Sequence, residues 1–250
     1  MKRLFDILIS IVIITLISPI LLLVGVLIFL TDFQSPFYIA ERVGKDFIIF
    51  KMIKLRSMRN DVSLKSIVST SLNDPRITKI GRIIRKYKID EFSQFLNVVS
   101  GHMSIVGPRP NVKVEVDLYT RDEKQILLVK PGITDLASIV FFDLNEILKY
   151  SKDPNTDYNQ LIRPWKSRLA LFYVYNRSLN LDFKIILITI LSFFNRRVAM
   201  NWVARILKNK NAQNNLIDIC KVEKVLYPFP PPGSNSIVSA DFRKSINNNM

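Results

Sequence analysis

The chain has 250 residues, with 36 Lys and Arg against 21 Asp and Glu, and a formal net charge of +15 at pH 7. Hydrophobic residues make up 48% of it, which excludes an intrinsically disordered chain, since such chains combine low hydrophobicity with high net charge. One cysteine, Cys220, and one histidine, His102, exclude a disulfide framework and a thiolate-rich or histidine-rich metal site. These properties indicate a protein of a reducing compartment that meets an anionic partner, such as a membrane surface or a nucleic acid.

The first predicted element is a membrane segment. The run Ile7–Leu30 has no charged residue and as one straight helix would measure ~36 Å, enough to cross a hydrocarbon core of ~30 Å. It is too long for the apolar region of a cleaved signal peptide, and no small-residue cleavage site follows it. We therefore expect an uncleaved anchor.

Two features of this run favour a re-entrant hairpin over a simple span. Ser18-Pro19 lies in its middle, where proline removes one helical hydrogen bond. Positive residues flank both ends of the run: Lys2 and Arg3 precede it, and Arg42 and several further Lys and Arg residues follow it. Such residues prefer the cytoplasmic side of a membrane. The sequence thus predicts two arms that enter and leave by the same face, with the Ser18 hydroxyl bonding a carbonyl that the proline frees. The alternative is a kinked helix that spans.

The next elements carry a strong positive charge. Residues 37–60 read as short extended segments, with a turn at 43–45 and a strand-like run at Phe47–Phe50, and residues 61–73 read as a loop. Asp74-Pro75 is expected to open a helix, with Asp74 as its cap. Along this helix cations recur every three residues, which predicts a basic amphipathic face able to lie on an anionic bilayer: Arg76, Lys79, Arg82 and Arg85. The alternatives are a solvated face or a nucleic-acid surface, but no known DNA-binding spacing accompanies it.

The rest of the chain is predicted to be mainly helical. A helix over Glu91–Val99 is stopped by Ser100-Gly101, and rigid turns follow at 107–110 and 130–134. Two further helices are expected over Leu161–Asn176 and Asp182–Lys208. The uncharged stretch Ile185–Asn195 is too short to span, so it belongs to a core or interfacial helix. We thus predict an anchor over 1–36, a catalytic domain over 37–208 and a polar, Pro-containing tail over 209–250.

Adjacent acidic residues mark the candidate chemistry. Asp90 and Glu91 follow closely on Arg85, Lys86 and Lys88, and these cations are expected to lower the pKa of both carboxyls and keep them ionised. An ionised Asp can attack phosphorus or hold Mg²⁺, and arginine binds phosphate in a bidentate manner. The alternative is structural, because acidic residues also stabilise the first turn of a helix.

Several linked motifs give these residues a context. In order along residues 1–207, the chain resembles the bacterial sugar transferase family, the monotopic phosphoglycosyl transferases or polyprenyl-phosphate sugar-1-phosphate transferases. The resemblance rests on the stretches Lys2–Asp6, Ser18-Pro19, Asp74–Gly81, Lys88–Val98, Gly101–Pro110 and Pro131–Thr134. It predicts the family's minimal, single-anchor form.

The resemblance implies a mechanism and a set of site residues. Asp90 would be the nucleophile that attacks a UDP-sugar to form an aspartyl-phosphosugar and release UMP, and undecaprenyl phosphate would then accept the sugar phosphate. Glu91 would assist, and Mg²⁺, held at Asp90, would neutralise phosphate charge. Arg85 and Arg109 match family positions implicated in phosphate binding, and Lys88, Pro108 and Pro110 are placed with them at the substrate.

The fold expected is a helix-dominated α/β domain on the cytoplasmic face of the bacterial inner membrane, with the re-entrant hairpin and amphipathic interfacial helices. It would contact membrane lipids, UDP-sugar and undecaprenyl phosphate but no nucleic acid, and would start O-antigen, capsule, exopolysaccharide or glycoprotein glycan synthesis. The stretch Asp135–Phe142 departs from the family pattern, so neither a donor sugar nor an oligomeric state is assigned. The alternative function is a non-catalytic anchored protein that binds through its basic face.

Overall fold

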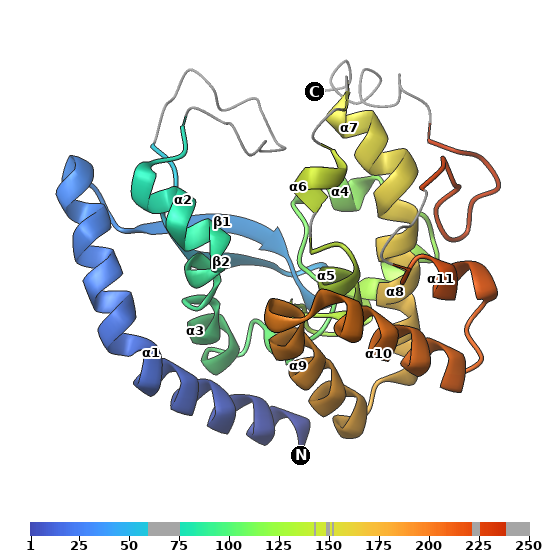
Figure 1. Ribbon diagram of the computed structural model, residues 1–250, viewed down its shortest axis with the longest axis horizontal. Coiled ribbons are helices and arrows are strands. Elements are labelled where there is room, and N and C mark those ends of the chain that lie inside the picture. Colours follow the sequence, from blue (N-terminus) through green and yellow to red (C-terminus); the bar gives the residue numbers. More distant parts are fainter. Residues whose placement is uncertain (60–75, 143, 149–150, 152, 222–225, 239–250) are drawn as a thin grey trace. The chain divides into compact units, whose positions relative to one another are not determined.

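The computed structural model describes residues 1–59, 76–142, 144–148, 151, 153–221 and 226–238 (Figure 1). The predicted loop at 61–73 and the predicted helix start at Asp74-Pro75 lie outside the described residues. Contacts divide the chain into two compact units, one formed by residues 1–116 and 129–133 and the other by residues 117–128 and 134–250. Helices dominate the secondary structure and strands are few, which confirms a helix-dominated α/β fold.

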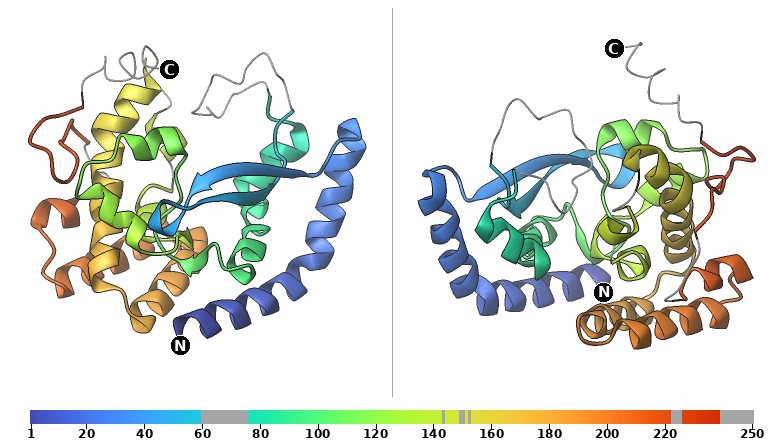
Figure 2. Two further views of the ribbon diagram at one scale, coloured as in Figure 1. Left: turned by 180° about the vertical axis from the view of Figure 1, so that it is seen from behind. Right: turned by 45° about the horizontal axis from the view of Figure 1, so that its top comes forward.

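The first unit begins with one long helix, α1 (Lys2–Asp32), which contains Pro19. It is the one helix among the described residues that is long and apolar enough to cross a membrane. The views in Figures 1 and 2 show that α1 bends between its two halves. Pro19 cannot donate to the carbonyl of Thr15, and the Ser18 hydroxyl donates to that oxygen instead, at 3.0 Å. This confirms the rebonding expected of Ser18, although the helix runs on through the proline without an interruption.

Both ends of α1 are fixed to the rest of the first unit. Near the N-terminus, Asp6 is buried and accepts a hydrogen bond of 2.7 Å from the Ser104 hydroxyl, and Arg3 donates to the Val98 and Val99 carbonyls at 2.5 and 2.9 Å. The other attachments occur at the C-terminal end.

At that end, Asp32 pairs with the buried Arg56 through both carboxylate oxygens. Arg56 also donates to the Ser35 carbonyl, at 2.7 Å. Between the two attachments, most apolar side chains of the helix are exposed: Leu8, Ile11, Val12, Leu16, Ile20, Leu22, Leu23, Val26, Leu27, Phe29 and Leu30. An apolar surface of this extent is typical of a helix that meets lipid or a partner.

A β-hairpin follows α1. Strand β1 (Phe37–Val43) pairs antiparallel with β2 (Ile49–Leu55), in a register that runs from Phe37 opposite Leu55 to Val43 opposite Ile49. The strand-like run predicted at Phe47–Phe50 is therefore misplaced by two residues, because a short 3-10 turn (Lys45–Phe47) makes the connection. The predicted turn at 43–45 lies at this connection.

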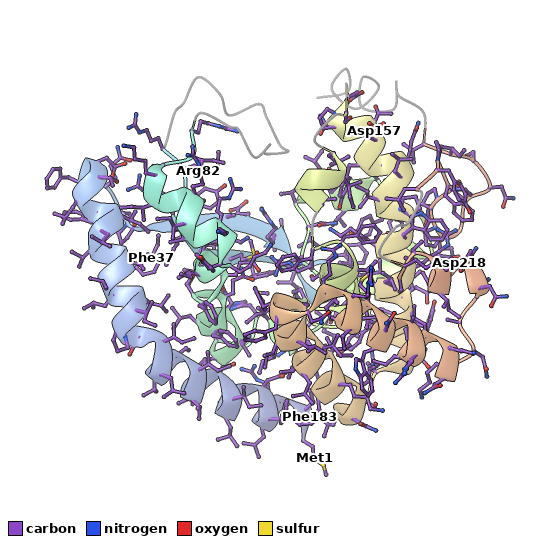
Figure 3. All side chains as sticks on the ribbon, viewed as in Figure 1. Met1, Phe37, Arg82, Asp157, Phe183 and Asp218 are labelled. Carbon is purple, nitrogen blue, oxygen red and sulfur yellow. The ribbon has the colours of Figure 1, made fainter. Side chains whose placement is uncertain are left out.

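The basic helix is α2 (Lys79–Lys86), and it begins later than expected, with Thr78 rather than Asp74 as its cap. Gly81 lets α2 approach the end of β2, because a Cβ there would lie 1.9 Å from the Ser57 carbonyl oxygen. Ile84 packs with Ile28 of α1 and Leu55 of β2 in a small core. The opposite face of α2 is exposed and carries Lys79, Arg82 and Lys86. Figure 3 labels Arg82 on this helix.

Helix α3 (Gln94–Val99) and two short strands complete the first unit. Ser100 ends α3 and Gly101 follows with φ 95°, which confirms the predicted stop. Strand β3 (Ser104–Val106) pairs with β4 (Gly132–Thr134), so part of the loop predicted at 130–134 is a strand. Helix α4 (Lys113–Asp117) ends at the boundary of the unit.

The second unit is built around α8 (Arg163–Asn176), close to the predicted Leu161–Asn176. A 3-10 segment (Glu123–Leu128) and the short helices α5 (Leu136–Val140), α6 (Leu144–Ile147), α7 (Pro154–Asp157) and α11 (Asn214–Asp218) belong to it, with a π-turn over Tyr158–Ile162. The buried Glu123 pairs with Arg163 at 2.6 Å and accepts a hydrogen bond from Ser167, also at 2.6 Å.

The single helix predicted over Asp182–Lys208 is wrong. The chain forms α9 (Leu179–Phe194) and α10 (Arg196–Asn209) instead. Asn195 separates them because its backbone is extended (φ −144°, ψ 94°) and its side chain accepts the Val198 N–H, so it caps α10. One side of α9 is buried, whereas its other side and the start of α10 expose Phe183, Leu187, Ile190, Phe193, Phe194, Val198 and Trp202 (Figure 3).

Part of the C-terminal segment packs on α8. The Phe229 ring stacks on Trp165 with centroids 4.5 Å apart. The backbone N–H of Phe229 donates to the Gln160 carbonyl at 3.0 Å. Arg168 lies over the same ring at 4.7 Å and donates to the Pro230 carbonyl at 2.9 Å. Residues 226–238 thus form a strap on the second unit.

Candidate active site

Three segments of the first unit bring the candidate residues together: strand β2, the 3-10 turn Ile89–Glu91 and the turn at 107–110. The attachment of α3 to β2 fixes the first two. The Asn97 amide accepts the Ile53 N–H at 2.9 Å and donates to the Lys51 carbonyl at 2.8 Å, as a neighbouring strand would. The Ser93 hydroxyl adds a bond of 3.1 Å to the Ile53 carbonyl.

The residue before the turn has an uncommon backbone conformation. Lys88 lies in the left-handed region with φ 57° and ψ 21°, which costs a non-glycine residue roughly 1–2 kcal/mol. This conformation ends α2 and starts the turn that carries Asp90 and Glu91. Strain held next to a buried carboxylate is typical of functional sites.

Two motif glycines fix the third segment. A Cβ on Gly132 would lie 2.1 Å from the Gly107 nitrogen, and one on Gly107 would lie 2.5 Å from the Lys130 carbonyl oxygen. The two backbones can cross only because both residues lack a side chain. The Gly132 N–H donates to the Pro108 carbonyl at 2.9 Å, so this crossing sets the position of Arg109.

Glu91 is held by two cations. Arg109 grips it in a bidentate manner, with Nη1 3.1 Å from Oε2 and Nη2 2.8 Å from Oε1, and Lys54 lies 3.3 Å from Oε1. Burial by itself would raise the pKa of Glu91, but the charges of Arg109, Lys54 and Lys88 outweigh it and lower the pKa to about 2. Glu91 is therefore ionised throughout the working range of pH.

Asp90 has the opposite electrostatics. It is buried, and its carboxylate makes no hydrogen bond within the part of the chain that the structure describes. Burial and the negative charge of Glu91 raise the pKa of Asp90, against the attraction of Lys54, Arg85 and Lys88. The prediction that nearby cations lower both carboxyl pKa values is thus right for Glu91 and wrong for Asp90, because the closest cations bind Glu91.

The other predicted residues differ in position. Arg85 and Lys88 are half-buried, and their charges act on Asp90. Pro108 and Pro110 are buried on either side of Arg109, where their fixed φ stiffens the turn that aims the guanidinium. The structure brings Asp90, Glu91, Arg85, Lys88 and Arg109 into one cluster, and their roles toward substrate stay predictions.

Sequence reasoning missed two members of the cluster. Lys54 lies on β2 and contacts Glu91, and Arg42 lies on β1 with a charge that acts on Arg109. The extended run that contains Lys54 also contains Lys51, so the sequence alone did not show which of the two lysines lies at the site. No local signal pointed to Arg42, since its place depends on the register of the hairpin.

The cluster has a donor set that suits Mg²⁺ bound together with a phosphate. Mg²⁺ usually takes one or two carboxylates plus phosphate and water oxygens. Asp90 offers a carboxylate without a hydrogen bond in the described chain, whereas Arg109 and Lys54 occupy the oxygens of Glu91. No group of three acidic, histidine or cysteine side chains gathers in the described residues. Asp90 would therefore hold the ion, and the substrate would complete its ligands.

Comparison with known proteins identifies the class. A model of the bacterial sugar transferase family matches residues 1–196. The chain belongs to this family of transferases, as the motifs predict.

Individual relatives agree with this assignment. The exopolysaccharide production protein PSS of Rhizobium leguminosarum bv. phaseoli is 36% identical over 207 residues, which cover 78% of this chain and 96% of that protein. The UDP-galactose-lipid carrier transferase of Erwinia amylovora is 40% identical over 156 residues, 56% of this chain and 32% of that protein. The UDP-glucose:undecaprenyl-phosphate glucose-1-phosphate transferase of Escherichia coli K12 is 32% identical, with 80% of this chain and 41% of that protein covered. The chain thus spans less than half the length of the last two.

The opposite pKa shifts predict opposite effects of neutralising the two carboxyls. The pKa of Asp90 is raised, so its ionised form is disfavoured in the folded state at pH 7. Asp90→Asn should therefore stabilise the protein, by about 1 kcal/mol or a rise of about 2–4 °C in Tm. Glu91→Gln should destabilise it by about 2 kcal/mol, because Arg109 and Lys54 lose their counter-charge. Thermal unfolding at pH 7 in metal-free buffer measures both.

The pH dependence separates charge from packing. Since the folded pKa of Glu91 is about 2 and its ordinary value is 4.5, its contribution is complete above pH 4.5 and is lost as the pH falls toward 2. The difference between wild type and Glu91→Gln should shrink over that range. A lower Tm for Asp90→Asn at pH 7 would contradict the electrostatic assignment.

Proposed function

We propose that this protein transfers a sugar-1-phosphate from a UDP-sugar to undecaprenyl phosphate through a covalent aspartyl-phosphosugar on Asp90. The proposal rests on one observation above the others: a buried carboxylate without a hydrogen bond in the described chain lies within a cluster of cations. The names of the E. coli and E. amylovora relatives support the substrate class. The product would start the synthesis of a lipid-linked glycan, such as an exopolysaccharide or capsule.

The electrostatics suit a carboxylate nucleophile. A carboxylate bonded to several donors is stabilised and poorly nucleophilic, whereas a desolvated one with a raised pKa is more reactive. Arg109 and Lys54 bind Glu91 rather than Asp90. These cations therefore hold the site together without lowering the nucleophilicity of the Asp90 carboxylate. Glu91 then serves as a positioning residue for Arg109 and Lys54.

Two displacements at phosphorus complete the reaction. An Asp90 carboxylate oxygen bonds to the β-phosphorus of the UDP-sugar while the bond from that phosphorus to the bridging oxygen breaks, and UMP leaves with the electron pair. A phosphate oxygen of undecaprenyl phosphate then bonds to the same phosphorus, and the bond to Asp90 breaks. The cations around Asp90 neutralise charge on the equatorial oxygens. Mg²⁺, when bound at Asp90 and the phosphates, would supply further neutralisation.

The attachment of α1 supports a re-entrant anchor with the catalytic residues on the cytoplasmic face. Lys2 to Asp6 contact α3 and β3, and Asp32 contacts Arg56 after β2. Both ends of the apolar helix are thus bound to the same unit, which also carries Asp90 and Glu91. A helix that spanned would place its ends on opposite sides of a ~30 Å core, and the bend at Pro19 offers the return instead.

The amphipathic helices are proposed to lie at the headgroup level. The exposed apolar side of α9 and the exposed cations of α2 belong to different units, and each has the composition of an interfacial surface. A lipid acceptor whose phosphate lies in the same layer could then reach Asp90 without leaving the membrane.

An assay of UMP release tests the reaction. With Mg²⁺, undecaprenyl phosphate and a panel of UDP-sugars, the wild-type protein should release UMP with at least one donor. Asp90→Asn should reduce turnover by at least a thousandfold, since it removes the nucleophile. Asp218→Asn, which removes an exposed carboxyl of the second unit, should leave turnover unchanged.

Two results would contradict the proposal. Turnover by Asp90→Asn at the wild-type rate would exclude Asp90 as nucleophile. Silence of the folded wild-type protein with every donor would favour a non-catalytic binding protein instead.

Site-directed labelling tests the anchor. Single cysteines in place of Lys2 and Lys45, in a Cys220→Ser background, should both resist an impermeant maleimide added to intact cells whose outer membrane is permeable. Both should react once the inner membrane is opened. Reaction of one but not the other in intact cells would show that α1 spans.

A further inference from the structure

Arg42 occupies a defined place on the inner face of the β-hairpin. Side chains alternate along a strand, and the register puts Arg42 opposite Phe50, Ala40 opposite Met52 and Tyr38 opposite Lys54. Phe50, Ala40 and Met52 are buried, so Arg42 and Lys54 lie toward opposite ends of one packed face. At its own end of this face, Lys54 has its Nζ 3.3 Å from Glu91 Oε1.

The other end of this face is joined to the Arg109 turn. The Val43 N–H donates to the Asn111 carbonyl at 2.9 Å. Arg42 directly precedes Val43, and the turn at 107–110 directly precedes Asn111, so this bond brings Arg42 near that turn. Electrostatics agree with this placement. Burial, opposed by Tyr38 and reinforced by the positive charge of Arg109, lowers the pKa of the Arg42 guanidinium. Arg42 and Arg109 are therefore like charges held close together.

The two guanidinium groups differ in what they already bind. Arg109 uses Nη1 for Glu91 and the Ile133 carbonyl, and Nη2 for Glu91. Within the described chain, Arg42 makes one hydrogen bond, from Nη1 to the backbone carbonyl of Glu41 at 2.8 Å, and no ion pair. An arginine has five N–H donors, so Arg42 keeps most of them for a ligand. Glu91 neutralises Arg109, but Arg42 has no counter-ion within the described residues, and an anion bound to it would offset its repulsion by Arg109.

The positions of the charged side chains indicate which kind of anion Arg42 would bind. Arg85 and Lys88 act on Asp90, Glu91 follows Asp90, Arg109 grips Glu91, and Arg42 acts on Arg109. The hairpin register puts Arg42 at the opposite end of the packed face from Lys54, a cation that acts on Asp90, and next to the turn that carries Arg109. A phosphate attacked by Asp90 would lie next to the cations that act on Asp90, which include Arg85 and Lys88. A ligand that also binds Arg42 would need a second anionic group, such as the second phosphate of a diphosphate.

We propose that Arg42 binds the second phosphate of the donor's diphosphate, the one that leaves in the nucleoside monophosphate, and so distinguishes the diphosphate donor from the monophosphate acceptor. This inference rests on the proposed function for the position of the attacked phosphorus. Arginine suits the task because its planar fork binds phosphate through two parallel hydrogen bonds, which lysine cannot do.

The test compares donor and acceptor kinetics in Arg42 variants of the full-length protein. Arg42→Ala should raise KM for the UDP-sugar about ten- to a hundredfold, as expected for a lost charge-assisted bidentate contact. It should weaken inhibition by UMP to a similar extent and leave KM for undecaprenyl phosphate within about twofold. Arg42→Lys should recover only part of the loss, and added guanidinium ion should partly rescue Arg42→Ala. Arg121→Ala, at an exposed position of the second unit, is the matched control and should change none of these.

Two measurements keep the inference separate from the proposed function. Thermal unfolding confirms that Arg42→Ala is folded, and the conservative Arg42→Gln replaces it if it is not. Binding of UDP and UMP by calorimetry does not need turnover, so it tests Arg42 even if no donor releases UMP. Unchanged UDP binding and donor KM in the folded variant would overturn the inference, as would an equal rise in both KM values.

Discussion

The bidentate ion pair between Glu91 and Arg109, with Lys54 as its third member, is the interaction on which the site depends. It joins the 3-10 turn that carries both carboxyls, the turn after β3 and the second strand of the hairpin. Because its three side chains are half-buried, water and salt screen it less than they would an ion pair on the surface. It also uses the cations nearest the acidic pair, and Asp90 is left desolvated beside a negative neighbour. Two adjacent carboxyls thereby acquire opposite electrostatic environments, as the proposed division between a positioning acid and a nucleophile requires.

The same unit also binds both ends of α1. Asp6 is buried against Ser104, and Asp32 is paired with the buried Arg56, so the ends of α1 cannot move independently of the hairpin and α3. Within the part of the chain that the structure describes, no side-chain ion pair holds the apolar surface between them, and this surface is largely exposed. A membrane would supply the missing burial, since apolar surface gains roughly 25 cal/mol per Å² when it leaves water. Helix α1 and the turn that carries the proposed nucleophile are therefore parts of one compact unit.

Sequence reasoning reached the parts of this arrangement that depend on local chemistry. The Asp90-Glu91 pair, the stop at Ser100-Gly101 and the Ser18 bond at Pro19 each follow from a few neighbouring residues, and the structure contains all three. The long helix over Asp182–Lys208 was wrong because Asn195 takes an extended conformation and caps a new helix, which its hydrophobic pattern does not reveal. Thr78 caps α2, and the close approach of Gly81 in its first turn to Ser57 is a tertiary contact that the local sequence does not reveal.

Long-range pairing explains what sequence reasoning missed at the site. Lys54 and Arg42 join the cluster only through the hairpin register and the bond from Val43 to Asn111. The direction of the Asp90 shift likewise depends on which carboxylate the cations reach, and proximity in sequence gave the wrong answer. Local charge density in the sequence marks the candidate site, but the tertiary fold decides which of its two carboxyls has the raised pKa.

Mass spectrometry of a reaction stalled by omission of the lipid acceptor tests the central claim most directly. Acid-quenched protein, incubated with Mg²⁺ and a donor UDP-sugar, should carry one sugar phosphate on the peptide that contains Asp90, and Glu91→Gln should carry its adduct on the same residue. An adduct on any other side chain, or UMP release with no adduct on rapid quenching, would contradict the account.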